Sequence, residues 1–376
     1  MRESMLRHMG ILSCIALALA SCRSSRLDDR IPFRKSEKKT NLEAVGYADL
    51  EGWNADDSAR ALKAFRRSCA KITAEGDFIG SSQIVISTDF MKEACMAAPS
   101  ADDKASAKRY FEEWFDPYKV SSTDPSADKG LFTGYYEAEV EGEIRPDCDH
   151  LVPIYGRPSD LSESLPYKTR AEIENNGIRA KAPVLFWAKS PSAVHILHIQ
   201  GSGVVKTKKG ERFRIGYAGN NGHKFSGIGS ILLSGGIKPD GGYSMQAVKK
   251  WLDANPKQAK KLMQKNKRFI FFRDIDGDGP IGAMGVPLTA GRSIAVDGEF
   301  IPFGMPLFIS TRDPDGREIR RLAIAQDTGA AIKGAVRADI FFGGGARAFE
   351  KAGRMSSQGS YYILLPKDGK NFAVKK

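Results

Sequence analysis

Histidine and cysteine are both scarce in this chain, with five of each among 376 residues. So few histidines give little support to metal sites or to Ser-His catalysis, and no Gly-x-Ser-x-Gly motif is present. Residues 274–279 match only the first half of a calcium-binding loop, because Gly285 stands where the closing glutamate belongs. We therefore expect no metal and no cofactor.

Long hydrophobic runs are also missing. The longest one near the start, Met9 to Ala20, follows Arg2 and Arg7 and is too short to span a bilayer comfortably. This layout is typical of a secretory signal at residues 1–21. The closing Leu-Ala-Ser-Cys22 resembles the lipobox of bacterial lipoproteins, in which the cysteine is lipidated. An ordinary signal peptide cut near Ser21 is the alternative.

Arg23 follows Cys22, and for such lipoproteins this implies the periplasmic face of the outer membrane in a Gram-negative bacterium. Residues 22–43 are polar and charged, which predicts a flexible tether between lipid and body. The net charge of +12 suits anionic lipid surfaces and the carboxylate-rich cell wall. Nucleic acid is not an expected partner in this compartment.

The first part of the mature chain is predicted to be helical, from Gly52 to Tyr118. Ala61, Leu62 and Phe65 recur at helical spacing and predict a core face. Beyond Cys22 only three cysteines remain, so one disulfide at most can form among them. We expect Cys69 to pair with Cys95, because both fall in this helical region and the compartment permits oxidation.

Strand patterns dominate from Gly130 to Tyr243, where short apolar runs alternate with Gly, Pro, Asn and Ser. This pattern predicts a small β-barrel or sandwich. Within it we read Val194 to Gln200 as a strand, which would place His195 and His198 on opposite faces. The nearby glycine-rich turns suit sugar binding as well as ordinary hairpins.

A helix is predicted from Ser244 to Gln264, followed by further strands. The last of these include two apolar runs, Leu322 to Ala325 and Ala338 to Phe342, which carry Asp327 and Asp339. A carboxylate in an apolar strand is costly unless it is hydrogen-bonded or functional. The two aspartates are therefore either a catalytic site or structural acceptors, and the residues alone favour neither.

Ordered motifs along the chain carry a resemblance to a known family. They are Phe111-Glu-Glu-Trp-Phe, Thr133-Gly-Tyr-Tyr-Glu137, Ile199-Gln-Gly-Ser-Gly203, Tyr217-Ala-Gly-Asn-Asn-Gly222, Ile294-Ala-Val-Asp297, Ala325-Gln-Asp327-Thr-Gly329 and Ala338-Asp339-Ile-Phe-Phe-Gly343. In this order they resemble the membrane-bound lytic murein transglycosylase A family, which has a C-terminal three-aspartate (3D) domain.

The resemblance implies a mainly β fold with helices: a double-psi β-barrel, with a second β-barrel-like domain inserted and a groove between them. Residues 44–129 and 244–376 would form the barrel domain, and residues 130–243 the insert. The three aspartates correspond to Asp297, Asp327 and Asp339. By analogy with related barrels, Asp339 would be the catalytic acid, and the other two either raise its pKa or orient loops.

The implied activity is that of a lyase, an exolytic transglycosylase that cleaves the β-1,4 bond between MurNAc and GlcNAc in peptidoglycan and forms 1,6-anhydro-MurNAc. One aspartate would serve first as acid and then as base. We expect a monomer that binds glycan strands. Candidate sugar contacts are Tyr135, Tyr136, Gln200, Ser202, Tyr217 and Lys333. A two-carboxylate hydrolase and a non-catalytic peptidoglycan-binding lipoprotein remain alternatives.

Overall fold

The computed structural model describes residues 40–75, 81, 83–100, 103–123, 130–162, 166–277 and 279–374, within one compact unit that spans residues 38–376. The predicted signal peptide and Cys22 lie outside the described residues. The end of the predicted tether is wrong: β1 (Thr40–Ala44) pairs with β3 (Phe115–Ser122), so residues 40–43 belong to the folded body. No described helix is long and apolar enough to cross a membrane.

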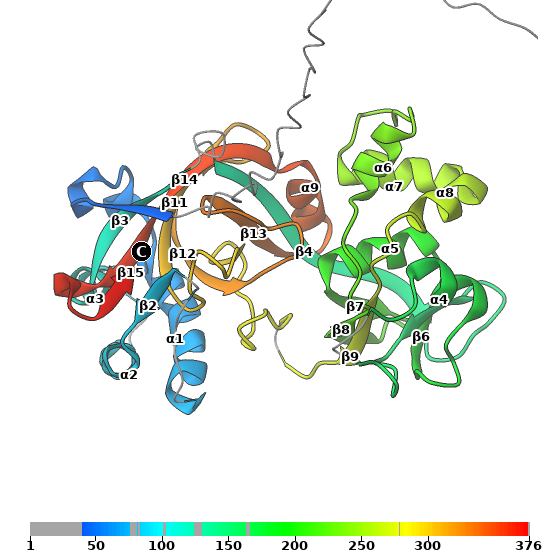
Figure 1. Cartoon of the computed structure of the whole chain (residues 1–376), viewed down its shortest axis with the longest axis horizontal. Coiled ribbons are helices and arrows are strands. Elements are labelled where there is room, and N and C mark those ends of the chain that lie inside the picture. Colours follow the sequence, from blue (N-terminus) through cyan, green and yellow to red (C-terminus); the bar gives the residue numbers. More distant parts are fainter. Residues whose placement is uncertain are drawn as a thin grey trace, which may run out of the picture. The chain divides into compact units, whose positions relative to one another are not determined.

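Six strands close into a first barrel, which appears in the left half of Figure 1. In spatial order they are β14 (Ser356–Pro366), β11 (Pro306–Arg312), β12 (Glu318–Asp327), β10 (Ser293–Val296), β13 (Arg337–Gly344) and β4 (Gly130–Glu143). The ring closes because β14 also pairs with β4. The pairs β10–β12 and β13–β4 are parallel and the others antiparallel. This closed mixed barrel confirms the predicted fold class.

Helices cover the first barrel where the sequence predicted them. They are α1 (Ser58–Glu75), α2 (Thr88–Ala97) and α3 (Lys104–Trp114), with the short strands β2 (Ile84–Ile86) and β15 (Phe372–Val374) paired beside them. The expected face of α1 is fully buried, and Phe65 packs edge-on against Phe111. The predicted helical region ends earlier than Tyr118, because β3 begins at Phe115.

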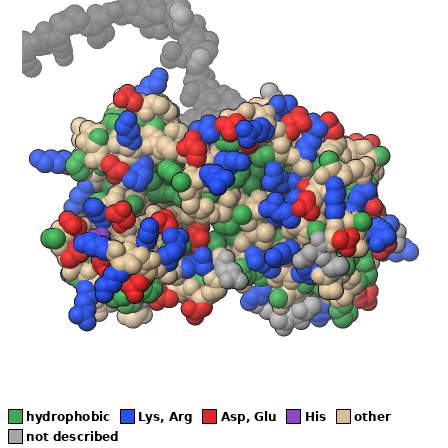
Figure 2. Space-filling model, turned by 180° about the vertical axis from the view of Figure 1, so that it is seen from behind, with side chains coloured by type: hydrophobic (Ala, Val, Ile, Leu, Met, Phe, Trp, Pro, Cys, Tyr) green, Lys and Arg blue, Asp and Glu red, His purple; other side chains and the backbone are tan. Residues whose placement is uncertain are grey.

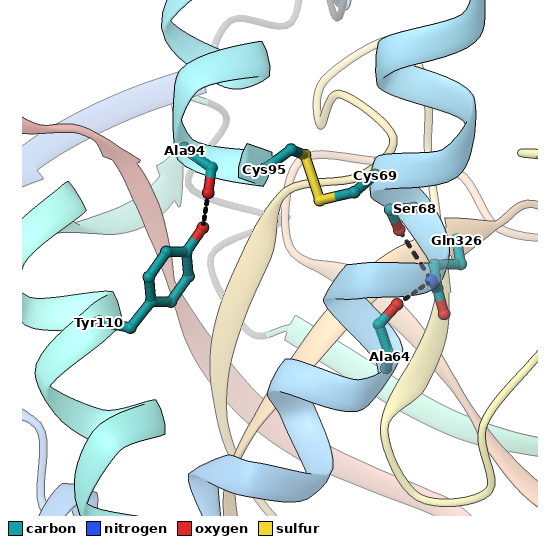
Figure 3. Close-up of a disulfide and its surroundings, with 7 residues drawn as sticks. All are labelled: Ala64, Ser68, Cys69, Ala94, Cys95, Tyr110 and Gln326. Carbon is teal, nitrogen blue, oxygen red and sulfur yellow. Dashed lines mark hydrogen bonds between the residues drawn. A yellow bond between two sulfur atoms is a disulfide. The ribbon is translucent and has the colours of Figure 1, made fainter. Parts of the chain in front are cut away.

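The predicted disulfide between Cys69 and Cys95 is confirmed and joins α1 to α2 (Figure 3). Next to it, the hydroxyl of Tyr110 donates to the carbonyl of Ala94 at 2.6 Å, which ties α3 to the end of α2. Because a covalent link restricts the unfolded chain, this three-helix cover is stabilised beyond its apolar packing. Cys148, the third mature cysteine of the prediction, is free and exposed.

β4 continues beyond the first barrel into a second one (Figure 1). Besides the far end of β4, the strands of this second barrel are β7 (Ser202–Lys206), β8 (Arg212–Asn220), β9 (Ile270–Asp274), β5 (Val152–Tyr155) and β6 (Val184–Ala188). β7 and β6 pair with the far end of β4, β8 and β9 follow β7, and β5 follows β6. A bridge between Gly156 and Phe272 joins the two ends. We call this half, residues 138–274, the second lobe.

The second lobe contains more helix than the sequence indicated. Its helices are α4 (Arg170–Asn176), α5 (Pro191–Gln200), α6 (Ile228–Ser234), α7 (Met245–Ala254) and α8 (Pro256–Met263). The predicted strand at Val194 to Gln200 is wrong. The segment is helix α5, because Ser190 caps its N-terminus, Pro191 occupies its first turn and Gly201 ends it in the left-handed region. The predicted helix from Ser244 to Gln264 is two helices, separated at Asn255.

Lys and Arg side chains lie over both halves of the face seen in Figure 2, interspersed with Asp and Glu. The net charge of +12 is therefore not concentrated in one patch on that face.

One more helix, α9 (Ala346–Arg354), follows β13 and packs against β13 and β4.

Candidate active site

Strand pairing places Asp327 and Asp339 in one row across the first barrel. Asp339 on β13 is the register partner of Thr133 on β4 and of Ala295 on β10. Ala295 is in turn the partner of Asp327 on β12. Residues opposite each other in a sheet point to the same side, and two strand spacings separate the two aspartate backbones by about 10 Å.

The carboxyl group of Asp339 receives a single hydrogen bond from the described residues. The hydroxyl of Thr133 donates to its Oδ1 at 2.7 Å, and its Oδ2 has no such partner in this part of the chain. Burial raises the pKa of Asp339 to about 6, against the lowering effects of Thr133 and of the Arg337 charge; the charge of Asp327 raises it further. Asp339 can therefore hold a proton near neutral pH.

Arg337 fixes the direction of the Thr133 hydroxyl. Its Nη2 donates to the Thr133 oxygen at 2.8 Å, and its Nη1 donates to the carbonyl of Leu131 at 3.0 Å. Arginine has no acceptor, so the Thr133 oxygen must accept this bond, and its own proton is free to point at Asp339. A side chain two residues before Asp339 thus orients the donor that Asp339 uses.

Asp327 differs from Asp339 in being fully hydrogen-bonded. The backbone amides of Ala283 and Thr328 each donate to its Oδ1 at 2.9 Å, and the hydroxyl of Tyr135 donates to its Oδ2 at 2.9 Å. Burial raises the pKa of Asp327, while these three donors oppose the rise because they favour the charged form. Burial likewise raises the pKa of Tyr135 well above its usual value, so Tyr135 remains a donor.

The residue before Asp327 points to the other side of β12 and anchors the strand. Gln326 is fully buried, and its amide nitrogen donates to the carbonyl of Ala64 and to the hydroxyl of Ser68, both on α1 (Figure 3). Its amide oxygen accepts from Ser293 at 2.6 Å. With these bonds made, Gln326 holds the end of β12 in place and so positions Asp327.

Asp297 is a structural acceptor rather than a member of the row. Its side chain is 2% exposed and accepts from the backbone amide of Gly334 at 2.9 Å and from Lys333 at 3.2 Å. It also accepts from the amide of Glu299 at 3.3 Å. Gly334 adopts a φ of 117°, which a residue with a side chain rarely does, so this glycine lets the loop after β12 reach Asp297.

Apolar side chains surround the row on its own side of the sheet. Tyr135, Leu288, Ala295, Ile332 and Phe341 form one buried cluster, and the rings of Tyr135 and Phe341 lie 5.2 Å apart. Phe341 follows Asp339 by two residues on β13 and so shares its face. Ala295 of this cluster is the register partner of Asp339, and burial is the main cause of the raised pKa of Asp339.

The predicted sugar contacts do not all lie with the aspartates. Tyr136 faces away from Tyr135, its ring 5.2 Å from that of Phe349 on α9. Its amide donates to the side chain of Gln200 at 3.0 Å. Ser202 begins β7, and Tyr217 on β8 is 47% exposed and accepts a bond from Asn220. These four belong to β4 and the second lobe, and only Tyr135 touches an aspartate of the row.

Sequence reasoning missed Thr133 and Arg337. The sequence contained a signal for each of them. Thr133 opens the motif Thr133-Gly-Tyr-Tyr-Glu137, and Arg337 lies two residues before Asp339, on the same strand face. No sequence signal pointed to the amide of Ala283, which approaches Asp327 from a loop 44 residues away.

The chain is similar to several known proteins. A family model described as "MltA specific insert domain" matches residues 131–273, and one described as "3D domain" matches residues 292–365. Among curated proteins, the membrane-bound lytic murein transglycosylase A of Vibrio cholerae is 27% identical over 87% of this chain and 94% of its own length.

Two solved structures extend the comparison. MltA from Neisseria gonorrhoeae is 31% identical, with a TM-score of 0.75 over 90% of this chain and 95% of that one. Escherichia coli MltA with bound chitohexaose is 26% identical, with a TM-score of 0.66 over 86% of this chain and 94% of that one. The barrel with its row of aspartates, the inserted lobe and these matches together place the chain in the membrane-bound lytic murein transglycosylase A family.

Proposed function

We propose that this protein is a lytic transglycosylase that cleaves the β-1,4 bond between MurNAc and GlcNAc in peptidoglycan, with Asp339 as its single acid and base. Its relatives are named for this murein activity, and one of them binds chitohexaose, a chain of β-1,4-linked N-acetylglucosamine. The observation that carries the assignment to Asp339 is the contrast in hydrogen bonding: Asp339 has one donor and a raised pKa, whereas Asp327 has three donors.

The reaction needs one carboxyl group that changes role. Protonated Asp339 gives its proton to the glycosidic oxygen as the bond from that oxygen to C1 of MurNAc breaks, leaving oxocarbenium character on the sugar. The Asp339 carboxylate then takes the proton from the C6 hydroxyl of the same MurNAc, and the C6 oxygen bonds to C1. The product is a 1,6-anhydro sugar, no water is consumed, and Asp339 ends protonated as it began.

The full coordination of Asp327 argues against a hydrolase with two carboxylates. Such an enzyme needs a second carboxylate free to act as nucleophile or as base for water. Both oxygens of Asp327 already accept from Ala283, Thr328 and Tyr135, and Asp297 is occupied by Gly334 and Lys333. In this proposal Asp327 positions Tyr135 and raises the pKa of Asp339 by its charge, and Asp297 organises the loop after β12.

In this proposal the glycan lies between barrel and insert, in the groove that the family resemblance implies, with contacts from the groups that the sequence suggested. Tyr135 lies nearest the row; Tyr136, Gln200, Ser202 and Tyr217 offer further contacts from β4 and the second lobe. The insert extends past the predicted end at Tyr243, to about Asp274. This boundary is supported by the pairing of β9 with β8 and by the insert family model.

The relatives are membrane-bound by name. Lipid on Cys22 would hold this chain at the periplasmic face of the outer membrane, where residues 22–39 would bridge to β1 and leave the barrel free to reach the wall. Incorporation of labelled palmitate, lost in a Cys22→Ala variant, is the expected result, and retention of the label in that variant would exclude this anchor.

Mass spectrometry of the muropeptides released from purified sacculi tests the function. Wild type is expected to release anhydro products one water lighter than hydrolytic ones, and Asp339→Asn to reduce the release by about 10²- to 10⁴-fold, the usual worth of a general acid. Asp240→Asn, the same change at an exposed site, serves as the control.

Two other outcomes separate the alternatives. Products of full hydrolytic mass would replace the transglycosylase with a hydrolase. Binding to sacculi without release by wild type would favour a peptidoglycan-binding lipoprotein.

A further inference from the structure

The second lobe touches the first barrel through a helix contact as well as through β4. Helix α9 follows β13, the strand that carries Asp339, and lies on the side of the first barrel toward α7 (Figure 1). Gln246, in the first turn of α7, reaches across this contact. A residue of the insert therefore meets the helix that follows the strand of Asp339.

The side-chain amide of Gln246 bonds to the backbone of α9. Its Nε2 donates to the carbonyl of Phe349 at 2.9 Å and to that of Glu350 at 3.3 Å. Gly353 leaves room for this amide, because a Cβ atom there would lie 2.4 Å from Oε1 and 2.5 Å from Nε2 of Gln246. Gly353 lies within α9, and alanine adopts helical backbone readily. The Gln246 amide, rather than the backbone, is therefore the reason that glycine fits best here.

The Gln246 amide is buried at a cost. Its Oε1 accepts no hydrogen bond from the residues that the structure describes. A buried acceptor without a partner offsets much of what the Nε2 bonds contribute to stability. What the amide adds over an apolar side chain is direction, because a hydrogen bond to a chosen carbonyl allows only one placement of α7 against α9.

The residue before Gln246 supports a candidate sugar contact. Sδ of Met245 lies 4.0 Å from Nε2 of Gln200, whose Oε1 accepts from the amide of Tyr136 on β4 at 3.0 Å. The ring centroid of Tyr136 in turn lies 5.2 Å from that of Phe349, whose carbonyl Gln246 uses. The start of α7, the end of α5 and α9 thus form one connected junction beside β4.

We propose that Gln246 is a positioning residue for glycan cleavage: by fixing α7 to α9, it holds Gln200 and the rest of the second lobe in place relative to Asp339. The inference rests on the proposed function, because it concerns how a glycan bound by the second lobe is presented to that acid. Gln246 acts through α9. Its loss leaves the row of aspartates intact but lets the second lobe tilt about β4, so the arrangement that binds glycan is populated less.

Steady-state muropeptide release from soluble glycan strands tests this role. Gln246→Ala is expected to raise KM about three- to fivefold and to leave kcat within about twofold, since one net hydrogen bond is worth about that change in population. Gln258→Ala, at an exposed position of α8, is the control and should change neither constant. An unchanged KM in Gln246→Ala, or a loss confined to kcat, would overturn the positioning role.

A second variant displaces the same amide without altering Gln246. The methyl group that Gly353→Ala adds should push the amide off the carbonyls of α9, so this variant is expected to reproduce the rise in KM. Gly229→Ala in α6 is the matched control, because a Cβ atom there meets nothing closer than Tyr243 at 3.8 Å. A normal KM in Gly353→Ala would also overturn the role.

Urea unfolding of the double variant checks that Gln246 and Gly353 act on each other. Alanine favours a helix over glycine, so Gly353→Ala should raise the midpoint more in the Gln246→Ala background, where the amide is gone, than in wild type. Gly229→Ala should shift the midpoint equally in both backgrounds. Equal shifts for Gly353→Ala would refute the contact, and because this measurement needs no glycan, such a failure is distinct from a failure of the proposed function.

Discussion

Within the first barrel Asp56 and Gln326 use nearly every hydrogen-bonding atom they have, while in the second lobe His195 uses neither ring nitrogen. Asp56 receives Arg292 on both oxygens, at 2.8 and 2.9 Å, and the amide of Leu322 on one of them. Gln326 bonds to α1 and to Ser293. Both halves bury polar side chains. Among the described residues the first half leaves single atoms of Thr40, Ser58 and Arg292 without a partner, whereas the second lobe leaves three ring nitrogens of His195 and His198 and the amide oxygen of Gln246.

This difference in hydrogen bonding separates groups whose bonds are all made within the fold from groups that keep hydrogen-bonding capacity. A buried polar atom with all its bonds made gains nothing from a ligand, whereas one without them does. By this criterion we infer that Asp327 and Asp297 stabilise the first barrel, whereas Asp339, with one donor, keeps hydrogen-bonding capacity for a substrate. In the second lobe His195 and His198 have unpaired ring nitrogens, but these are buried.

Breaking the buried ion pair of Asp56 and Arg292 should cost the most stability. Asp56→Ala leaves Arg292 buried without its partner, and loss of one member of such a pair typically costs about 3–5 kcal/mol in the free energy of unfolding. Urea unfolding measures the loss. The surface pair of Glu51 and Arg320 provides the control, because Glu51 is 76% exposed and Glu51→Ala should cost less than about 1 kcal/mol. Equal losses would show that burial is not what distinguishes the pairs.

Removing the disulfide between α1 and α2 should cause the next largest loss of stability. Cys69 and Cys95 lie 26 residues apart, and closing a loop of that size stabilises the fold by about 2–4 kcal/mol. A double alanine variant should therefore show a lower urea midpoint, whereas Cys148→Ala, at an exposed free cysteine, should not. An unchanged midpoint in the double variant would mean that packing alone holds α1 to α2.

Asp339→Asn should increase stability at neutral pH while removing activity. The pKa of Asp339 rises from 3.8 in the unfolded chain to about 6, so the native state holds the proton more tightly and loses stability as pH rises from about 4 to 6. Asparagine removes this cost. The expected gain in the free energy of unfolding is near zero at pH 3.5 and about 1–3 kcal/mol at pH 7.5.

Asp327→Ala tests the contrast from the other side. Alanine leaves the buried amides of Ala283 and Thr328 without their acceptor, so this variant should lose about 1–3 kcal/mol at pH 7.5. If Asp339→Asn were destabilising to the same degree, Asp339 would be a structural acceptor like Asp327, and the contrast between them would fail.

Much of the first barrel was predictable from sequence, since its strands and helices carry clear periodic patterns and its motifs occur in family order. The disulfide followed from compartment and count. The second lobe was harder. Helix α5 was read as a strand because its run of Val, Ile and Leu is apolar all round, and periodicity alone cannot separate a buried helix from a strand. The caps Ser190 and Gly201 were the signal available.

The site was predictable in its aspartates but not in their roles. Whether a carboxylate is saturated depends on which amides approach it, and the amide of Ala283 comes from a distant loop whose path the sequence does not display. The same holds for Gln246: the carbonyls that it binds belong to α9, a distant part of the sequence, so only the folded chain brings them together.

The smallest expected effect is a shift in the pH dependence of cleavage. Thr133 donates to the charged form of Asp339, so Thr133→Val should raise the pKa of Asp339 and move the alkaline limb of activity to higher pH. A single net hydrogen bond is worth about 1 kcal/mol, which limits the movement to roughly 0.7 pH unit. Thr133→Ser keeps the hydroxyl and should keep the limb. Muropeptide release measured from pH 4 to 9 distinguishes the two roles of Thr133. If the alkaline limb of activity moves in neither variant, Thr133 only packs beside Asp339. If the limb moves in Thr133→Val alone, Thr133 is a positioning residue, and Arg337 directs its hydroxyl.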